Sequence, residues 1–263
     1  MDLDIEGNAA LITASSSGLG KAAATSLAEE GVDVVLNGRD ADRLATTADD
    51  VREVAAGRVV IQPGDITDPE AITQLVERTI DEFGRLDHLV TSAGGPPSGQ
   101  FLDIPIEEWY DTFELLVMSV VRLVHEAEPH LTSDGGGTIV NITSRSVKEA
   151  IDALVLSNSV RMSVIGLEKT LSKELAPDVR VNAVLPGMIE TARVEELLTD
   201  AVDRGEYDTY EGALESRGNS IPVGRIGEPQ DLGDLVAFLS SPKAGYITGV
   251  AIPIDGGAGA SNL

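Results

Sequence analysis

The chain has 263 residues and carries 44 acidic residues against 19 lysines and arginines, a formal net charge of −25 at pH 7. This excess of negative charge excludes nucleic acid as a partner, because phosphate binding needs clustered lysines and arginines. The absence of cysteine excludes a disulfide scaffold, a thiolate zinc site and a cysteine nucleophile.

Short apolar runs alternate along the chain with longer segments of helical periodicity. This alternation is typical of a mostly parallel sheet with helices on both faces. We therefore expect one doubly wound α/β domain over residues 1–263, with about seven strands. In chain order we expect a strand at 8–13, a helix to about 30, strands at 32–37 and 58–62, a helix at 69–84, a strand at 86–91, a helix at 106–131, a strand at 138–142, a helix at 152–176, a strand at 179–184, a helix at 229–240 and a strand at 251–254.

The polar segment 189–220 follows the end of an expected strand. Ligands bind at the carboxyl ends of strands in such sheets, so we expect this segment to be a mobile substrate lid. No apolar run approaches the ~20 residues of a membrane helix. The acidic N-terminus does not resemble a signal peptide, and the expectation is a soluble cytoplasmic protein.

The acidic residues are spread along periodic segments rather than clustered, and only five bases are lysines. This composition resembles that of proteins from salt-loving archaea, in which molar salt screens the self-repulsion of the surface. The three histidines, at 88, 125 and 130, lie in no metal-binding spacing, so we expect no metal centre.

A turn rich in small residues, 13–20 (TASSSGLG), follows the first strand and opens a helix. Small residues let the backbone approach a pyrophosphate, and a helix N-terminus offers free N–H groups and positive partial charge. A dinucleotide site is therefore expected here.

Six segments in order resemble the motifs of the short-chain dehydrogenases/reductases. The turn at 13–20 resembles that family's TGxxxGxG fingerprint, with Ala14 in place of the first glycine. The others are 64–68 (GDITD), 91–94 (TSAG), 137–144 (GTIVNITS), 180–187 (RVNAVLPG) and 246–257 (YITG to DGG). The resemblance implies a Rossmann fold and cofactor contacts from Thr13, Ser15, Ser17, Gly18, Leu19, Gly20, Arg39, Asp65, Ile66, Ser92, Ala93, Gly94, Pro186, Gly187, Ile189 and Thr191.

The end of the second strand reads Asn37-Gly38-Arg39. An acid at this place accepts from the ribose hydroxyls of NAD, whereas an arginine accommodates the 2′-phosphate of NADP. Gly38 stands where the acid would be, and Arg39 can pair with a phosphate, so we favour NADP(H) over NAD(H). Alternatively, Arg39 stacks over adenine, which suits either cofactor.

The family resemblance implies a catalytic tyrosine and lysine, spaced i,i+4 on a helix, with a serine and an asparagine. The serine is present as Ser144. Thirteen residues on, however, the pattern YxxxK is replaced by Ser157 and Arg161, and Leu116 stands where the asparagine is expected. A serine hydroxyl is a poor proton donor, and an arginine stays charged but can hold an oxyanion or carboxylate.

Three functions remain open at this point. The first is an oxidoreductase acting on a small carbonyl or hydroxyl substrate, with a rewired catalytic set of Ser144, Lys148, Ser157 and Arg161. In it Lys148 supplies the proton, Tyr207 or Tyr210 could supply a phenol from the lid, and Arg145 and Arg161 would suit an anionic substrate. The second is an NADP(H)-binding sensor or subunit with little hydride transfer, and the third is a dehydratase or lyase.

The catalytic residues have other interpretations. Lys148 could be a solvated loop residue, Arg161 could pair with Asp152 or Glu168, and the lid tyrosines could serve packing. From the family we expect a homodimer or homotetramer formed through the segments 106–131 and 152–176. A small-molecule substrate is the other expected partner, with neither nucleic acid nor membrane involved.

Overall fold

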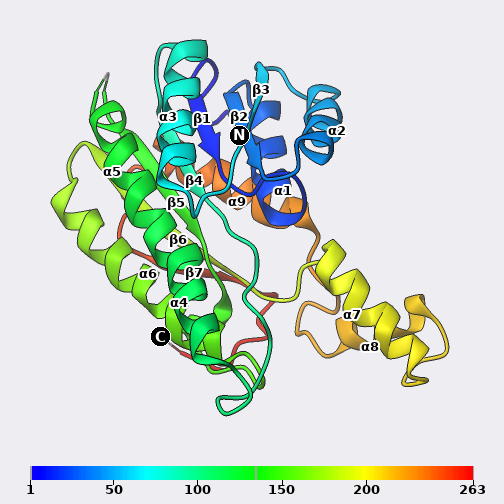
Figure 1. Cartoon of the computed structure of the whole chain (residues 1–263). Helices are drawn as coiled ribbons and strands as arrows, with labels where there is room; N and C mark the ends of the chain where they lie inside the picture. The colour runs from blue at the N-terminus through cyan, green and yellow to red at the C-terminus, as the bar shows by residue number, and fades with distance from the viewer. Residues whose placement is uncertain (1, 134, 263) are drawn as a thin grey trace.

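One parallel sheet forms the centre of the computed structural model, which describes residues 2–133 and 135–262 (Figure 1). The sheet order is β3-β2-β1-β4-β5-β6-β7, and all neighbouring strands are parallel. The order reverses between β1 and β4, which makes their carboxyl ends the switch point where such sheets bind ligands. The strands are β1 (Ala9–Ile12), β2 (Asp33–Gly38), β3 (Val59–Pro63), β4 (His88–Thr91), β5 (Gly137–Ile142), β6 (Val179–Pro186) and β7 (Ala251–Ile254).

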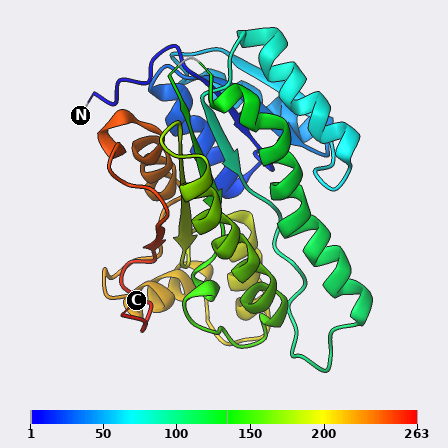
Figure 2. The same cartoon turned by 90° about the vertical axis from the view of Figure 1, so that its left-hand side faces the viewer.

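Helices cover both faces of this sheet (Figures 1 and 2). They are α1 (Gly18–Glu29), α2 (Ala41–Arg52), α3 (Pro69–Phe83), α4 (Ile106–Phe113), α5 (Ser119–Leu131), α6 (Val155–Glu174), α7 (Ala192–Asp203), α8 (Tyr210–Asn219) and α9 (Pro229–Ser240), with short helical turns η1 (Glu114–Met118), η2 (Arg145–Val147) and η3 (Pro242–Ala244). The prediction of a doubly wound α/β domain with about seven strands is confirmed.

The strands are apolar on both faces, because each face is covered. Ile12 belongs to a buried cluster with residues of α1, α2 and α9, whereas its neighbour Leu11 belongs to a cluster with residues of α3 and α5. Alternate residues of a strand point to opposite faces, so the apolar runs seen in the sequence are the signature of a sheet buried on both sides.

Helix α2 is absent from the sequence expectations, which name no element between the second and third strands. Its buried face consists of Leu44, Thr47, Ala48 and Val51, which have helical spacing. Only two of the four are large apolar side chains, since Thr47 is polar and Ala48 is small. Asp40 caps its N-terminus by accepting from the backbone N–H groups of residues 42 and 43. The apolar signal is therefore weak although the capping residue is present.

The helix expected at 106–131 changes its winding in the middle. Residues 114–118 form a turn of π-helix, η1, between α4 and α5. Leu116 lies in this turn, is buried, and packs in a small cluster with Val117, Val160 and Val164. Such wide turns occur frequently at functional sites, and this one lies beside the cavity described below.

The segment expected to be an irregular lid is largely helical. It forms α7 and α8, which stand apart from the sheet in Figure 1 and share a buried cluster of Leu198, Ala213, Ile221 and Ile226. The Tyr210 hydroxyl donates to Glu190 at 2.9 Å and ties α8 to the start of the segment. Among the described residues, no helix is long and apolar enough to cross a membrane.

Candidate functional site

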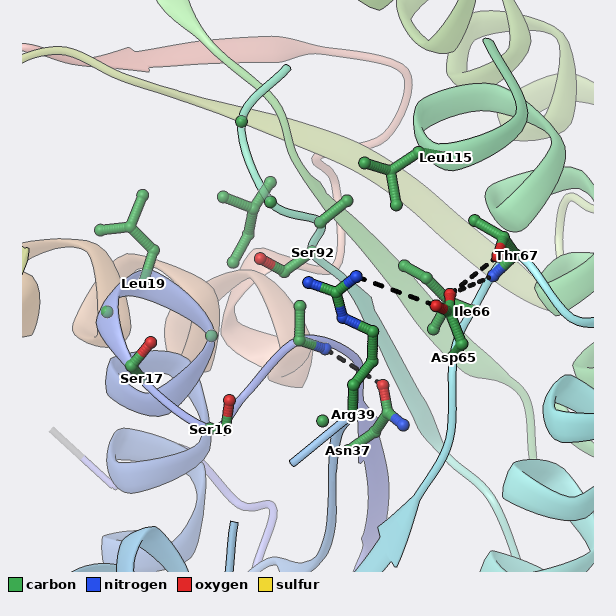
Figure 3. A pocket seen from close by; sticks show the side chains of 18 of the residues that line it. Ser16, Ser17, Leu19, Asn37, Arg39, Asp65, Ile66, Thr67, Ser92 and Leu115 are labelled. Atoms are coloured by element: carbon green, nitrogen blue, oxygen red, sulfur yellow. Dashed lines mark hydrogen bonds and ion pairs between the residues drawn. The ribbon is translucent and has the colours of Figure 1, made fainter. Parts of the chain in front are cut away.

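A cavity of about 840 Å³ lies at the carboxyl ends of the central strands. Segments that follow β1, β2, β3, β4, β5 and β6 all contribute to its wall, and residues of α1, α2, α4, η1, α6 and α7 complete it. Figure 3 shows part of this lining. A cleft of this size at the switch point of the sheet has the place and volume of a dinucleotide site. The lining residues are Ala14, Ser16, Ser17, Gly18, Leu19, Gly20, Asn37, Gly38, Arg39, Arg43, Gly64, Asp65, Ile66, Thr67, Ser92, Ala93, Gly94, Gly95, Asp111, Glu114, Leu115, Ile142, Thr143, Arg161, Thr191 and Ala192.

The turn before α1 leaves the helix N-terminus free for an anion. The N-cap residue Ser17 makes no side-chain capping bond, and no acidic residue lies in the first turn of α1. By contrast, Asp40 and Asp68 cap α2 and α3. A Cβ at Gly20 would lie 2.5 Å from the carbonyl oxygen of Ala14, so only glycine allows the turn to be this tight. Free N–H groups and the positive helix end suit a pyrophosphate.

Ala14 takes the left-handed conformation that glycine would adopt more cheaply, with φ of 46°. The Asn37 side chain holds this turn. Its Oδ1 accepts from the Ala14 N–H (Figure 3), and its Nδ2 donates to the carbonyls of Gln62 and Gly64. Asn37 thus connects β2, the phosphate turn and the segment after β3. The sequence alone places Asn37 in a strand and gives no sign of this positioning role, because the contacts join segments that are distant along the chain.

Two arginines stand at the β2 end of the cavity. Arg39 is largely exposed, and its guanidinium lies 3.9 Å from the Asp65 carboxylate (Figure 3). Arg43 lies four residues later on α2 and lines the same end. Asp65 also accepts from the backbone N–H and the hydroxyl of Thr67. The arginine charge at this end is therefore only partly offset by a protein carboxylate.

Eleven of the sixteen expected cofactor residues line the cavity, namely Ser17, Gly18, Leu19, Gly20, Arg39, Asp65, Ile66, Ser92, Ala93, Gly94 and Thr191. Thr13, Ser15, Pro186, Gly187 and Ile189 are not among its lining residues. The Thr13 hydroxyl bonds to the carbonyl of Ser92, and the Ser15 hydroxyl joins β1 to β2. Their side chains therefore hold the strand ends together. Their backbone contacts to a cofactor stay a prediction.

Three serines lie together at the end of β5. The Ser144 hydroxyl accepts from the backbone N–H of Ser146 at 3.1 Å, and the hydroxyls of Ser146 and Ser157 are 2.9 Å apart. Ser146 and Ser157 are buried. Ser157 thus shares its hydrogen bond with a second serine that the sequence reading missed, because only the fold brings residues 146 and 157 together.

Arg161 is a buried cation that lines the cavity. It is 8% exposed, and its Nε has no hydrogen-bond partner among the described residues. The described residues also form no ion pair with it within 4.0 Å, so the expected alternative partners Asp152 and Glu168 do not neutralise it. Burial lowers the pKa of its guanidinium from 12.5 to about 10, which leaves it charged at neutral pH.

Lys148 stands one turn after Ser144, at the end of η2, and its side chain is exposed. It is not among the lining residues of the cavity. The phenol of Tyr210 donates to Glu190, and burial, followed by this bond to Glu190, raises its pKa to about 12. Tyr207 packs in the α7–α8 cluster. Neither tyrosine is among the lining residues of the cavity, and roles for Lys148 or the lid stay predictions.

Several lining residues were missed for a physical reason. Arg43 was missed because α2 was missed, although its spacing of four from Arg39 was visible. Asp111, Glu114 and Leu115 enter the wall through the bend of α4 and η1, which a helical pattern does not reveal. Glu114 forms an ion pair with Arg122.

No group of three histidines or carboxylates that could hold a metal occurs among residues 2–133 and 135–262. His88 lies in β4 at the opposite end of the strand from the cavity. It is buried, and burial lowers its pKa to about 4. It therefore stays neutral at pH 7 and contributes no charge to the cavity.

The whole chain resembles known reductases and dehydrogenases. A family model described as enoyl-(acyl carrier protein) reductase matches residues 13–259. The 3-oxoacyl-(acyl-carrier-protein) reductase FabG of Thermotoga maritima is 32% identical over 96% of this chain and 98% of the relative. L-rhamnose 1-dehydrogenase (NAD(P)(+)) of a Sphingomonas species is 32% identical over 96% of each chain. A crystal structure of L-sorbose reductase from Gluconobacter frateurii, complexed with NADPH and L-sorbose, matches with a TM-score of 0.94 and 32% identity, over 99% of this chain and 100% of that one.

Proposed function

We propose that this chain, which belongs to the short-chain dehydrogenase/reductase family and is an oxidoreductase of that type, uses NADP(H) and works through a rewired catalytic site. The reaction interconverts a small carbonyl compound and its alcohol: a hydride joins the carbonyl carbon and a proton joins the oxygen. Bound NADPH supplies the hydride. The observation that carries the proposal is the cavity itself, with an uncapped helix N-terminus at its centre and two arginines at one end.

The residues of the cavity fit a phosphorylated dinucleotide. Gly94 and Gly95 have open space where a Cβ would stand, so a flat ring can lie against this backbone. The N-terminus of α1 would hold the pyrophosphate. Arg39 and Arg43 would hold the 2′-phosphate, because two guanidinium groups exceed what Asp65 alone offsets. The NADPH named with the L-sorbose reductase structure supports the same choice.

The cofactor proposal is tested by titrating NADPH and NADH into the wild-type protein and into an Arg39→Ala/Arg43→Ala double variant in potassium chloride. We expect wild type to bind NADPH at least about tenfold more tightly than NADH, since hydrogen bonds to charged groups contribute about 1.5–3 kcal/mol each before screening. The double variant should lose this preference. Arg217→Ala, an exposed arginine on α8, is the matched control. Equal affinity of wild type for both nucleotides would contradict the proposal.

The proton must come by a route that differs from the family's tyrosine and lysine. We propose that the hydroxyls of Ser144 and Ser157 bind the substrate oxygen, with Ser146 orienting Ser157. The charge of Arg161 stabilises negative charge that develops nearby. We assign the proton to Lys148, because its side chain is exposed and lies one turn from Ser144, and its ammonium group forms no hydrogen bond or ion pair with the described residues.

Lys148→Met tests this assignment. We expect the rate of NADPH oxidation to fall at least about a hundredfold with little change in NADPH affinity, because proton transfer by a positioned side chain contributes roughly 10²–10⁴-fold. Lys173→Met removes an exposed lysine from the far end of α6 and should leave the rate unchanged. An unaltered rate in Lys148→Met would remove Lys148 from the mechanism.

We also propose a homodimer or homotetramer formed through α4, α5 and α6. The support is a set of exposed apolar side chains on α6, on α4 and just before α4, a density unusual for a monomer surface. They are Phe101, Leu102, Ile106, Tyr110, Phe113 and Met162. Light scattering in potassium chloride tests this: a monomer would refute it.

A further inference from the structure

Arg161 has a buried guanidinium group that forms no ion pair with the described residues. The inference drawn from it concerns the substrate and rests on the proposed function. A buried charge is normally paired, because leaving it without a counter-ion costs several kcal/mol of desolvation. Arg161 is more than nine-tenths buried, yet the described residues give its Nε no hydrogen bond and its guanidinium no carboxylate. A counter-ion for Arg161 would therefore be an anion bound in the cavity that Arg161 lines.

Nearby acids are already accounted for or lie elsewhere. Glu114 pairs with Arg122, and Asp65 faces Arg39. Glu168 lies two turns along the buried face of α6, and its Oε1 also lacks a partner. Arg161 and Glu168 are thus buried on one face of the helix without meeting, because seven residues at 1.5 Å each put them about 10 Å apart along the axis. Asp111 lines the cavity but is exposed and forms no ion pair with Arg161.

The phosphates of the proposed cofactor do not meet this need either. Arg39 follows β2, whereas Arg161 shares a small hollow with residues 92–93 after β4 and 142–143 at the end of β5. Three strand-to-strand steps separate β2 from β5 in the sheet, about 14 Å at the usual spacing of 4.7–4.9 Å. Arg161 therefore stands away from Arg39 and from the N-terminus of α1, the groups that would hold the phosphates of the cofactor.

Arg161 also lines a small hollow of about 20 Å³, which has room for one water molecule. The hydroxyls of Thr91, Ser119 and Thr143 at this hollow each donate their proton to a protein oxygen. The hollow is too small for a carboxylate group. An anion must then approach Arg161 from the open cleft.

We propose that Arg161 binds the carboxylate of the substrate, so that the enzyme interconverts oxo acids and hydroxy acids. The planar guanidinium can hold a carboxylate with two parallel hydrogen bonds. Ser157 stands one helical turn before Arg161 on the same face of α6. Ser144 and Ser157 are not among the cavity's lining residues, but they stand next to Thr143 and one turn from Arg161, which are. In the proposal, the serines hold the carbonyl and Arg161 holds the carboxylate of one small molecule. The double anchor orients the substrate in place of the missing tyrosine and lysine.

Calorimetric titration into the protein saturated with NADP⁺ tests this assignment. The probes are pyruvate, acetoacetate and levulinate, each paired with its neutral amide. We expect at least one acid to bind about tenfold or more tightly than its amide. Arg161→Met should abolish that difference, and Arg161→Lys should retain part of it. Arg217→Met, which removes the same charge from α8, should behave as wild type.

Other outcomes would overturn the assignment. An acid-over-amide preference that survives in Arg161→Met would place the carboxylate elsewhere, and equal binding of acids and amides by wild type would exclude a carboxylate site. Loss of NADP⁺ affinity in Arg161→Met, with no preference for acids in wild type, would assign Arg161 to the cofactor ribose. If wild type binds no NADP⁺, the proposed function fails, and titration of the acids into the free protein still decides the role of Arg161.

Discussion

Replacing Arg161 with methionine should stabilise the protein in the absence of ligands. The folded chain holds a charged guanidinium whose pKa burial lowers from 12.5 to about 10. At 1.36 kcal/mol per unit, this shift corresponds to about 3 kcal/mol that folding spends on keeping the charge buried. Methionine has a similar length, is flexible enough to fill the space, and carries no charge. We expect a gain of about 1–3 kcal/mol, because a water molecule beside Arg161 would lower the cost.

The assay is urea unfolding of the ligand-free protein at pH 7 and one fixed potassium chloride concentration. The midpoint should rise with an unchanged dependence on denaturant, which indicates an effect on stability alone. Thermal unfolding should shift upwards by roughly 2–12 °C, since about 2–4 °C correspond to 1 kcal/mol in a chain of this size. A loss of 1 kcal/mol or more in a folded variant would refute the reasoning, because Arg161 would then have a partner within the protein.

Three further predictions concern the acids, the lid and the charged surface. Burial raises the pKa of Glu168 from 4.5 to about 7. Below pH 4.5 the carboxyl is protonated in the folded and the unfolded protein and costs no stability, and the folded protein loses stability as the pH rises through 7 and the buried group ionises. Glu168→Gln should therefore gain about 2–3 kcal/mol at pH 8 but little at pH 4.5; parallel pH–stability curves from urea unfolding would contradict this. Tyr210→Phe removes the bond to Glu190 and should weaken the anchorage of α8 by about 1 kcal/mol, read as faster hydrogen exchange in residues 190–220 with an unchanged rate of hydride transfer. A slower chemical step in that variant would restore the phenol as a proton donor. Finally, the melting temperature of wild type should rise steadily up to molar potassium chloride, since the net charge of −25 is then screened; a flat or falling curve would oppose a salt-adapted surface.

The sheet and the centre of the cavity could be predicted because their signals are local. Each strand is a short apolar run between turn residues, and buried parallel strands need no alternation of polar residues. Likewise, the turn before α1 combines small residues with a helix start. Eleven lining residues, including Arg39 and Asp65, were expected only through the resemblance to the family's motifs at these strand ends.

The remaining features depend on contacts between distant segments. Helix α2 buries small residues and gives a weak apolar pattern, so Arg43 was missed with it. Ser146 and Ser157 meet only because η2 packs against α6. Thr13 and Ser15 look like cofactor ligands in the sequence, yet their hydroxyls join neighbouring strands. The isolation of Arg161 is likewise a property of the packed protein, because acids occur close to it in sequence and only the fold separates them.

The most direct test of the whole account follows deuterium from the cofactor to the product. Wild-type protein in potassium chloride is given NADPH doubly deuterated at the transferring carbon, together with pyruvate, acetoacetate or levulinate. We predict a hydroxy acid that is one mass unit heavier than the product formed with ordinary NADPH, and its near-absence with Arg161→Met under the same conditions. A wild-type protein that binds NADPH but transfers no deuterium to these acids, to their amides or to sugars would contradict the account. It would instead favour a nucleotide-binding sensor.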